Sequence, residues 1–190
     1  MPDLTLDPKT TALVVIDLQK GIAGMPTVPH PAADVVMRST KLADRFRTRQ
    51  ALVVLVHVDA GPSGVLFPRT ITDIERPRVT PAPGWSDIVP ELGPKPGDAV
   101  VTKHQPSAFF GTDLDIHLRR RGITTVVLCG ISTNVGVEST ARTGYEHGYH
   151  LVFVSDAMTA RDADLHTMAV TKYFPTIGRV RTTDEVLAAL

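Results

Sequence analysis

The sequence predicts an α/β fold in which a parallel sheet is covered by helices on both faces. Short runs rich in β-branched residues alternate along the chain with segments of helical length and periodicity. These runs are apolar throughout instead of alternately apolar and polar, which is typical of strands buried on both faces. The chain has 190 residues, enough for one domain with a substantial core, so we expect residues 1–190 to form a single domain.

The same patterns predict the order of the elements. The expected strands span 11–17, 51–58, 98–103, 124–129 and 151–154. The expected helices span 32–49, 112–121, 134–147, about 163–173 and a last segment from 182. Asp162 is a candidate N-cap, and Thr182 and Glu185 have the spacing of a capping box.

Residues 59–97 interrupt this alternation. The segment holds 39 residues, with eight of the 15 prolines and five glycines. A loop of this length in a compact domain is a functional lid, an interface segment or a disordered stretch. Trp85 and Phe67 are able to pack it down, which favours a lid or interface over disorder.

Composition excludes several classes of function. Lys and Arg total 20 and Asp and Glu total 20, so no strong field attracts nucleic acid or an anionic membrane. No apolar run is long enough to span a bilayer, and the first residues lack the pattern of a signal peptide. A single cysteine excludes an internal disulfide. We therefore expect a cytoplasmic protein that acts on a small molecule.

The carboxyl ends of the strands are the expected ligand site, because parallel sheets bind ligands there. Asp17 and Lys103 each end a strand, and His57 lies near the end of another. A desolvated carboxyl group coupled to a lysine transfers protons, although structural ion pairs use the same residues. Both interpretations are open from the residue types alone.

The stretch "CGISTNVGVESTAR", residues 129–142, reads as a strand end, a polar turn and the start of a helix. Free backbone N–H groups at such a helix start are able to form an oxyanion hole. Gly136 either lets a ligand approach the backbone closely or relieves crowding between helix and sheet.

Cys129 and the histidines are weaker candidates. Cys129 lies in the expected strand 124–129, and buried cysteines are usually inert. His57, His104 and His166 do not have the spacing of a metal-binding motif, so we expect no metal.

Three ordered blocks resemble the isochorismatase-like hydrolase family, also called the cysteine hydrolase family. "ALVVIDLQKG" (12–21) is similar to the opening strand with the family's catalytic aspartate, here Asp17. "VVTKHQPSAFFGTDLDIHLRRRGI" (100–123) is similar to the segment with its catalytic lysine, here Lys103. "CGISTNVGVESTARTGYEHGYHLVFVSDAM" (129–158) resembles the signature turn and helix.

The resemblance implies a three-layer α-β-α fold around a parallel sheet of six strands. It also implies a cis peptide between Ile131 and Ser132, an oxyanion hole near Ser132 and Gly136, no cofactor, and assembly into dimers or tetramers. On this basis we expect four residues to contact the substrate: Ser132, Gly136, Phe110 and His57.

Gly136 departs from the pattern of most members, which carry a nucleophilic cysteine at this position. Isochorismatases proper also lack the cysteine, and they hydrolyse a vinyl ether with release of pyruvate. The first hypothesis is therefore acid-catalysed hydrolysis of isochorismate or a related vinyl ether, with Asp17 as the acid and Lys103 holding it.

Other hypotheses remain open at this stage. Water activated by Asp17 would hydrolyse an amide or another carbonyl compound. A non-catalytic descendant would only bind a small molecule or a protein partner. Gly136 as a disabling substitution is a further alternative. Arg69, Arg76 and Arg78 are candidates to bind a substrate carboxylate, or they serve solubility alone.

Overall fold

Six parallel strands form one sheet in the computed structural model, which describes residues 4–61, 64, 66, 70–74 and 80–190. Along the sheet the order is β3-β2-β1-β4-β5-β6. The strands are β1 (Thr11–Ile16), β2 (Leu52–Val58), β3 (Ala99–Lys103), β4 (Thr125–Ile131), β5 (His150–Thr159) and β6 (Arg179–Arg181). The prediction of a parallel six-stranded α/β fold is confirmed.

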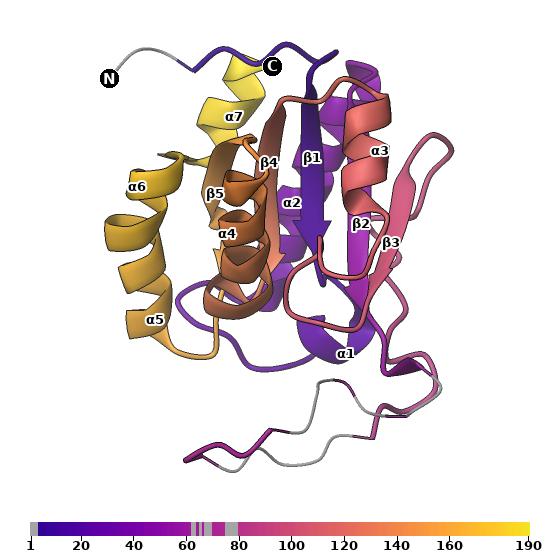
Figure 1. Cartoon of the computed structure of the whole chain (residues 1–190), viewed down its shortest axis with the longest axis vertical. Coiled ribbons are helices and arrows are strands. Elements are labelled where there is room, and N and C mark those ends of the chain that lie inside the picture. The colour runs from indigo at the N-terminus through magenta and orange to yellow at the C-terminus, as the bar shows by residue number, and fades with distance from the viewer. Residues whose placement is uncertain (1–3, 62–63, 65, 67–69, 75–79) are drawn as a thin grey trace.

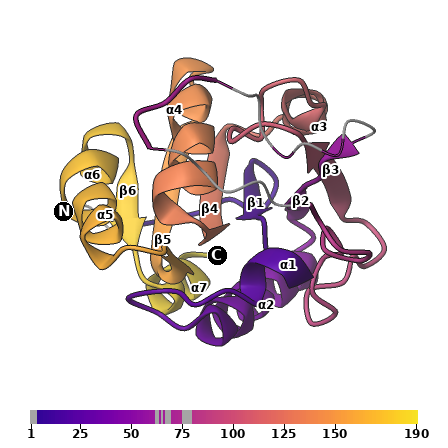
Figure 2. The same cartoon turned by 90° about the horizontal axis from the view of Figure 1, so that it is seen from below.

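Helices cover both faces of the sheet (Figures 1 and 2). They are α1 (Lys20–Ala23), α2 (Ala32–Thr48), α3 (Leu114–Arg120), α4 (Glu138–Glu146), α5 (Ala163–Met168), α6 (Phe174–Ile177) and α7 (Thr183–Ala189), with the π-helical turns η2 (Thr133–Val137) and η3 (Ala169–Tyr173). Helices α2 and α7 share one apolar core with residues such as Val15 and Cys129. Helices α3, α4 and α6 share the other, which contains Ile16 and Leu128. No helix in the described part of the chain is both long and apolar enough to cross a membrane.

Some elements differ from the sequence-based predictions. Strand β5 runs to Thr159, because a register shift against β4 is followed by renewed pairing of Ile131 with Thr159. The helix expected at 163–173 is divided into α5 and η3 and continues as α6. Strand β3 is buried on one face only, because it is an edge strand whose Val100 and Thr102 are exposed.

The strand order reverses between β1 and β4, which lie side by side at the centre of the sheet. From β1 the chain proceeds to β2 and β3 on one side, and from β4 to β5 and β6 on the other. Such a switch point leaves a crevice at the carboxyl ends of the strands, where open parallel sheets bind ligands. Residues that directly follow β1 and β4 therefore meet at the expected site.

The second part of the 59–97 loop is fastened to the carboxyl ends of the strands. Trp85 packs directly over Gly21, and the Gly21 N–H donates to the Trp85 carbonyl (2.9 Å). The first part, as far as it is described, extends away from the sheet below α1 (Figure 1). Phe67 and the three candidate arginines, 69, 76 and 78, lie outside the described residues. The lid or interface role of the loop stays a prediction, as does assembly into dimers or tetramers.

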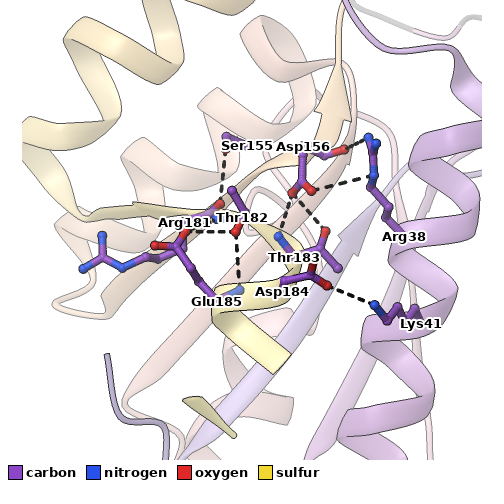
Figure 3. A network of polar contacts seen from close by, with 9 residues as sticks. All are labelled: Arg38, Lys41, Ser155, Asp156, Arg181, Thr182, Thr183, Asp184 and Glu185. Atoms are coloured by element: carbon purple, nitrogen blue, oxygen red, sulfur yellow. Dashed lines mark hydrogen bonds and ion pairs between the residues drawn. The ribbon is translucent and has the colours of Figure 1, made fainter. Parts of the chain in front are cut away.

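Helix α7 is held to the rest of the fold by a polar network (Figure 3). The Asp156 carboxylate accepts hydrogen bonds from the N–H and the hydroxyl of Thr183 (2.7 and 2.9 Å). The backbone carbonyl of Asp156 accepts one from Arg38 of α2 (2.7 Å). The predicted capping box is confirmed, since Thr182 and Glu185 each bond the other's backbone N–H. The end of the chain is thereby fixed against α2 and β5.

We expect Thr182→Ala to lower the free energy of unfolding by about 1 kcal/mol, because it removes the N-cap acceptor of α7. Thr182→Ser keeps the hydroxyl and serves as the matched control. Urea unfolding followed by circular dichroism measures both. Equal stability of the alanine and serine variants would contradict a contribution from the cap.

Candidate active site

Asp17 lies directly after β1, at the switch point of the sheet. Its backbone has a φ of 53°, and its N–H still donates to the Val56 carbonyl of β2 (2.9 Å). This left-handed conformation is uncommon for a residue other than glycine and is found where a site requires it. The side chain is buried, with 5% of the residue exposed, so the carboxyl group is removed from bulk water.

Lys103 reaches this carboxyl group from the end of β3. Its Nζ lies 2.8 Å from Asp17 Oδ2, and its side chain is 1% exposed. The same ammonium group donates to the Pro106 carbonyl (2.9 Å). Asp17 Oδ1 has no hydrogen-bond partner among the described residues. The ion pair therefore satisfies one carboxylate oxygen and leaves the other for a ligand or a proton.

Burial raises the pKa of the Asp17 carboxyl from 3.8 to about 6, because a desolvated carboxylate is less stable than the neutral acid. The charge and hydrogen bond of Lys103 oppose this effect, and His57 opposes it further. The resulting pKa lies near neutrality. At such a value a carboxyl group exchanges protons readily in either direction.

The turn after β4 supplies the second part of the site. The peptide bond between Ile131 and Ser132 is cis, as the family resemblance implied. The Ser132 carbonyl accepts from the N–H groups of Val135 and Val137 (3.1 and 3.2 Å), which closes the π-helical turn η2. Those two N–H groups are thus engaged within the turn.

Thr133 connects this turn to helix α5. Its buried hydroxyl lies 2.8 Å from Nδ1 of His166 in α5. Burial, with a smaller effect of His30, lowers the pKa of His166 to about 4, so the ring is neutral near pH 7. The sequence singled out His166 only as a weak metal candidate, whereas the structure uses it as a hydrogen-bond partner of the turn.

Gly136 brings the turn against the ion pair. An ideal Cβ at this position would lie 3.0 Å from Asp17 Oδ2 and 3.4 Å from Lys103 Nζ. The three predicted catalytic positions, Asp17, Lys103 and Gly136, are therefore adjacent. No nucleophilic side chain is present at position 136.

Thr140 joins the turn to the lysine segment, and sequence reasoning missed it. Its hydroxyl donates to the Gly136 carbonyl (2.7 Å) and accepts from the Ala108 N–H (3.0 Å). Ala108 lies two residues after Pro106, whose carbonyl binds Lys103. The only sequence signal was a threonine four residues after a glycine in a helix, a spacing that allows such a bond.

The four residues predicted to contact the substrate lie in different parts of the structure. Ser132 and Gly136 lie in the turn beside the ion pair. His57 engages both ring nitrogens, with the Ser86 carbonyl (2.9 Å) and the Thr102 hydroxyl (2.8 Å). Phe110 is 68% exposed and lies at the surface, outside the buried centre. Contact of any of the four with a substrate stays a prediction.

Gln19 is a further residue that sequence reasoning missed. Its side chain is fully buried and bonds the Val58 N–H (2.8 Å), the Val58 carbonyl (3.0 Å) and the Trp85 carbonyl (3.3 Å). It therefore connects the end of β2 with the fastened part of the 59–97 loop. Its position two residues after Asp17 was the only available signal.

Cys129 takes no part in this centre. Cys129 lies in the core shared with α2, and burial raises the pKa of its thiol to about 12, so it is not a nucleophile at neutral pH. Among the described residues, no three His, Cys, Asp or Glu side chains are placed to hold a metal ion.

Comparisons with known proteins show the family and support the fold. Residues 11–185 match the family model described as the isochorismatase domain. An isochorismatase family protein of Escherichia coli O157:H7 is 45% identical over 98% of this chain and 100% of its own. A ureidoacrylate amidohydrolase of Variovorax paradoxus (strain S110) is 33% identical over 81% of this chain and 70% of its own. The structure of an isochorismatase family protein from Burkholderia thailandensis has a TM-score of 0.94 at 49% identity, covering 100% of this chain and 99% of that one.

The raised pKa of Asp17 predicts how stability depends on pH. The folded chain binds the Asp17 proton more tightly than the unfolded chain, so this group's contribution to stability decreases as the pH rises from about 4 to about 6. Asp17→Asn removes this titration. Between pH 4.5 and pH 7 we therefore expect the parent to lose stability relative to Asp17→Asn. The difference between their free energies of unfolding should change by about 2 kcal/mol in favour of the variant.

Urea unfolding at both pH values measures this difference. Glu146→Gln, at an exposed position on α4, is the control and should show no comparable increase. A difference for Asp17→Asn that is the same at both pH values would contradict the raised pKa.

Proposed function

This chain belongs to the isochorismatase family of hydrolases, and we propose that it hydrolyses isochorismate or a related small vinyl ether without a covalent intermediate. In this proposal Asp17 is the general acid and Lys103 its electrostatic partner. Water is the nucleophile. No metal or cofactor takes part in the proposed reaction.

The observation that carries this proposal is the buried Asp17 carboxyl group, whose Oδ2 lies 2.8 Å from Lys103 Nζ and whose Oδ1 has no partner among the described residues. Burial raises its pKa to about 6. At pH 7 roughly one molecule in ten keeps this carboxyl protonated. An acid of this strength suits proton transfer to a weakly basic enol carbon. Gly136 offers no side chain for attack on a carbonyl, so chemistry that needs only an acid and water fits the centre best.

The proposed reaction balances with these groups alone. The Asp17 proton passes to the terminal CH₂ of the vinyl ether, and the positive charge is shared between the adjacent carbon and the ether oxygen. Water adds to that carbon, and its proton returns to Asp17. The hemiketal then breaks its bond to the ether oxygen: its hydroxyl loses a proton as the C=O bond forms, and the leaving oxygen gains one, which releases the alcohol and the keto acid. Lys103 stabilises the Asp17 carboxylate that exists between the two proton transfers.

The remaining predicted residues have supporting roles in this proposal. Backbone N–H groups near Ser132 and Gly136 donate hydrogen bonds to the leaving ether oxygen, which gains electron density as its bond to carbon breaks in the hemiketal. Phe110 and His57 contact the substrate on the side of the site that is nearest to β2 and β3. The arginines of the 59–97 loop are candidates for its carboxylates.

A second candidate is hydrolysis of an amide or another carbonyl compound by water, with ionised Asp17 as general base. The relative from Variovorax paradoxus, named an amidohydrolase, favours this reaction class. The turn after β4 supports it as well, because an oxyanion hole serves carbonyl chemistry directly. In this reaction an amide substrate would release ammonia or an amine in place of pyruvate.

We expect Asp17→Asn to lower pyruvate release from isochorismate by 10²–10⁴-fold, the usual contribution of a general acid. Coupled lactate dehydrogenase detects the pyruvate, and circular dichroism verifies the fold. Glu146→Gln is again the control and should keep the parent rate. Full activity of Asp17→Asn would refute the mechanism, and absence of pyruvate with the parent would remove isochorismate as the substrate.

The pH dependence of kcat/KM separates the two candidates. With Asp17 as an acid, activity falls as the pH rises above about 6; with Asp17 as a base, it falls as the pH drops below about 6. We expect Lys103→Met to shift this fall in activity to higher pH in either case, because loss of the cation raises the Asp17 pKa further. A fall at the same pH in the variant and the parent would contradict an effect of Lys103 on the Asp17 pKa.

A ligand that binds tightly and is recovered unchanged would indicate a non-catalytic descendant.

A further inference from the structure

Thr140 lies in α4, and its side chain is fully buried between backbone groups of two other segments. The hydroxyl donates to the Gly136 carbonyl (2.7 Å) and accepts from the Ala108 N–H (3.0 Å). An amide N–H is only a donor and a hydroxyl has a single proton, so the direction of both bonds is fixed. Thr140 therefore joins the turn η2 to the segment that follows β3.

The segment joined in this way supplies a hydrogen-bond acceptor for Lys103. Lys103 Nζ donates to the Pro106 carbonyl (2.9 Å) and lies 2.8 Å from Asp17 Oδ2. The Pro106 carbonyl and the Ala108 N–H belong to adjacent peptide units. A shift of the backbone at 108 is therefore transmitted directly to the carbonyl that orients the ammonium group.

The other end of this connection also lies beside the ion pair. An ideal Cβ on Gly136 would lie 3.0 Å from Asp17 Oδ2 and 3.4 Å from Lys103 Nζ. The contacts thus form a closed ring, from Thr140 through the turn and the ion pair and back along the segment that follows β3. One buried hydroxyl fixes the distance between the two sides of this ring.

A second threonine, one turn further along α4, does not duplicate this connection. Thr143 Oγ1 accepts from Ser107 Oγ (3.0 Å) and donates to the Ser139 carbonyl (3.1 Å). Its partners are a side chain and a carbonyl of its own helix. The bond from α4 to the backbone beside the lysine's acceptor is therefore made by Thr140.

We propose that Thr140 is a positioning residue, which places the Lys103 ammonium group beside Asp17 by tying the backbone after β3 to the turn. This inference deepens the proposed function and rests on its assignment of Asp17 and Lys103 to the reaction. Loss of the hydroxyl leaves the buried Ala108 N–H without its acceptor, which is costly enough to move that segment toward other partners. The ammonium group then follows the Pro106 carbonyl away from the carboxylate.

Titration of the Asp17 carboxyl by ¹³C NMR tests the proposal without a substrate. Thr140→Val has nearly the shape of the parent but lacks the hydroxyl. We expect the Asp17 pKa in this variant to rise by about 1 pH unit, because the cation that lowers it has moved away. Lys103 of β3 and His57 of β2 are the charged groups that act on Asp17, so the His57 signals are followed in the same spectra. Thr140→Ser keeps the hydroxyl and should keep the parent value.

A merely structural role would lower stability without raising this pKa. Thr183→Val is the matched control, because it removes a similarly buried threonine hydroxyl on α7, where the partner is Asp156. We expect both valine variants to lower the unfolding temperature by about 2–8 °C and only Thr140→Val to raise the Asp17 pKa. Thr140→Ala lacks the same hydroxyl and gives the same reading if the valine variant does not fold. An unchanged Asp17 pKa in both variants without the hydroxyl, or an equal rise in Thr183→Val, would overturn the proposal.

The rate of the proposed reaction gives a second reading. We expect Thr140→Val to lower kcat by about 10–100-fold with KM nearly unchanged, because small displacements of reacting groups are costly in the transition state. Thr140→Ser should keep the parent kcat. Equal kcat values for Thr140→Val and the parent would overturn the proposal. Failure of pyruvate release by the parent would affect only the proposed function, because the titration needs no substrate.

Discussion

The ion pair between Asp17 and Lys103 constrains the centre of this molecule more than any other interaction. A carboxylate and an ammonium group buried together must remain in contact, because removal of one partner from such a pair costs about 3–5 kcal/mol. The two residues end β1 and β3, with β2 between them. The register of three neighbouring strands therefore has to be maintained for the pair to form. The register of the sheet and the proposed chemistry therefore depend on the same contact.

Around the pair, polar groups of the backbone are satisfied by a few buried side chains. Thr140 binds the turn to the lysine segment, and Thr133 and His166 support the turn from α5. Asp17 Oδ1, in contrast, has no partner within the described residues. A buried polar atom without a partner is costly in a folded protein and needs an explanation. Among the described residues Ser39 and Thr40 also have unpartnered hydroxyl oxygens, but Asp17 Oδ1 is the one that belongs to the carboxyl group beside Lys103.

Much of the fold was predictable from local patterns, and much of the site was not. The runs at 11–17 and 51–58 predicted β1 and β2 because buried parallel strands need apolar residues on both faces. Helix α1 and strand β6 escaped prediction because four and three residues are too short for a period to be visible. Asp17 and Lys103 were identified as strand ends, but Thr140 resembles any other helical threonine in sequence. Its role depends on the Ala108 N–H from the lysine segment, which only the folded chain brings to it.

The stretch 60–84 of the long loop begins and ends at joined positions, since Ser86 Oγ donates to Asp59 Oδ2 (2.8 Å) and Gln19 bonds both Val58 and Trp85. This stretch therefore leaves and re-enters the body of the protein at one place. Insertions, deletions or exchange of that stretch therefore do not alter the distance that the rest of the chain has to span. Evolution or a protein engineer is therefore able to replace that stretch as a unit, while the ion pair and the turn are left as they are.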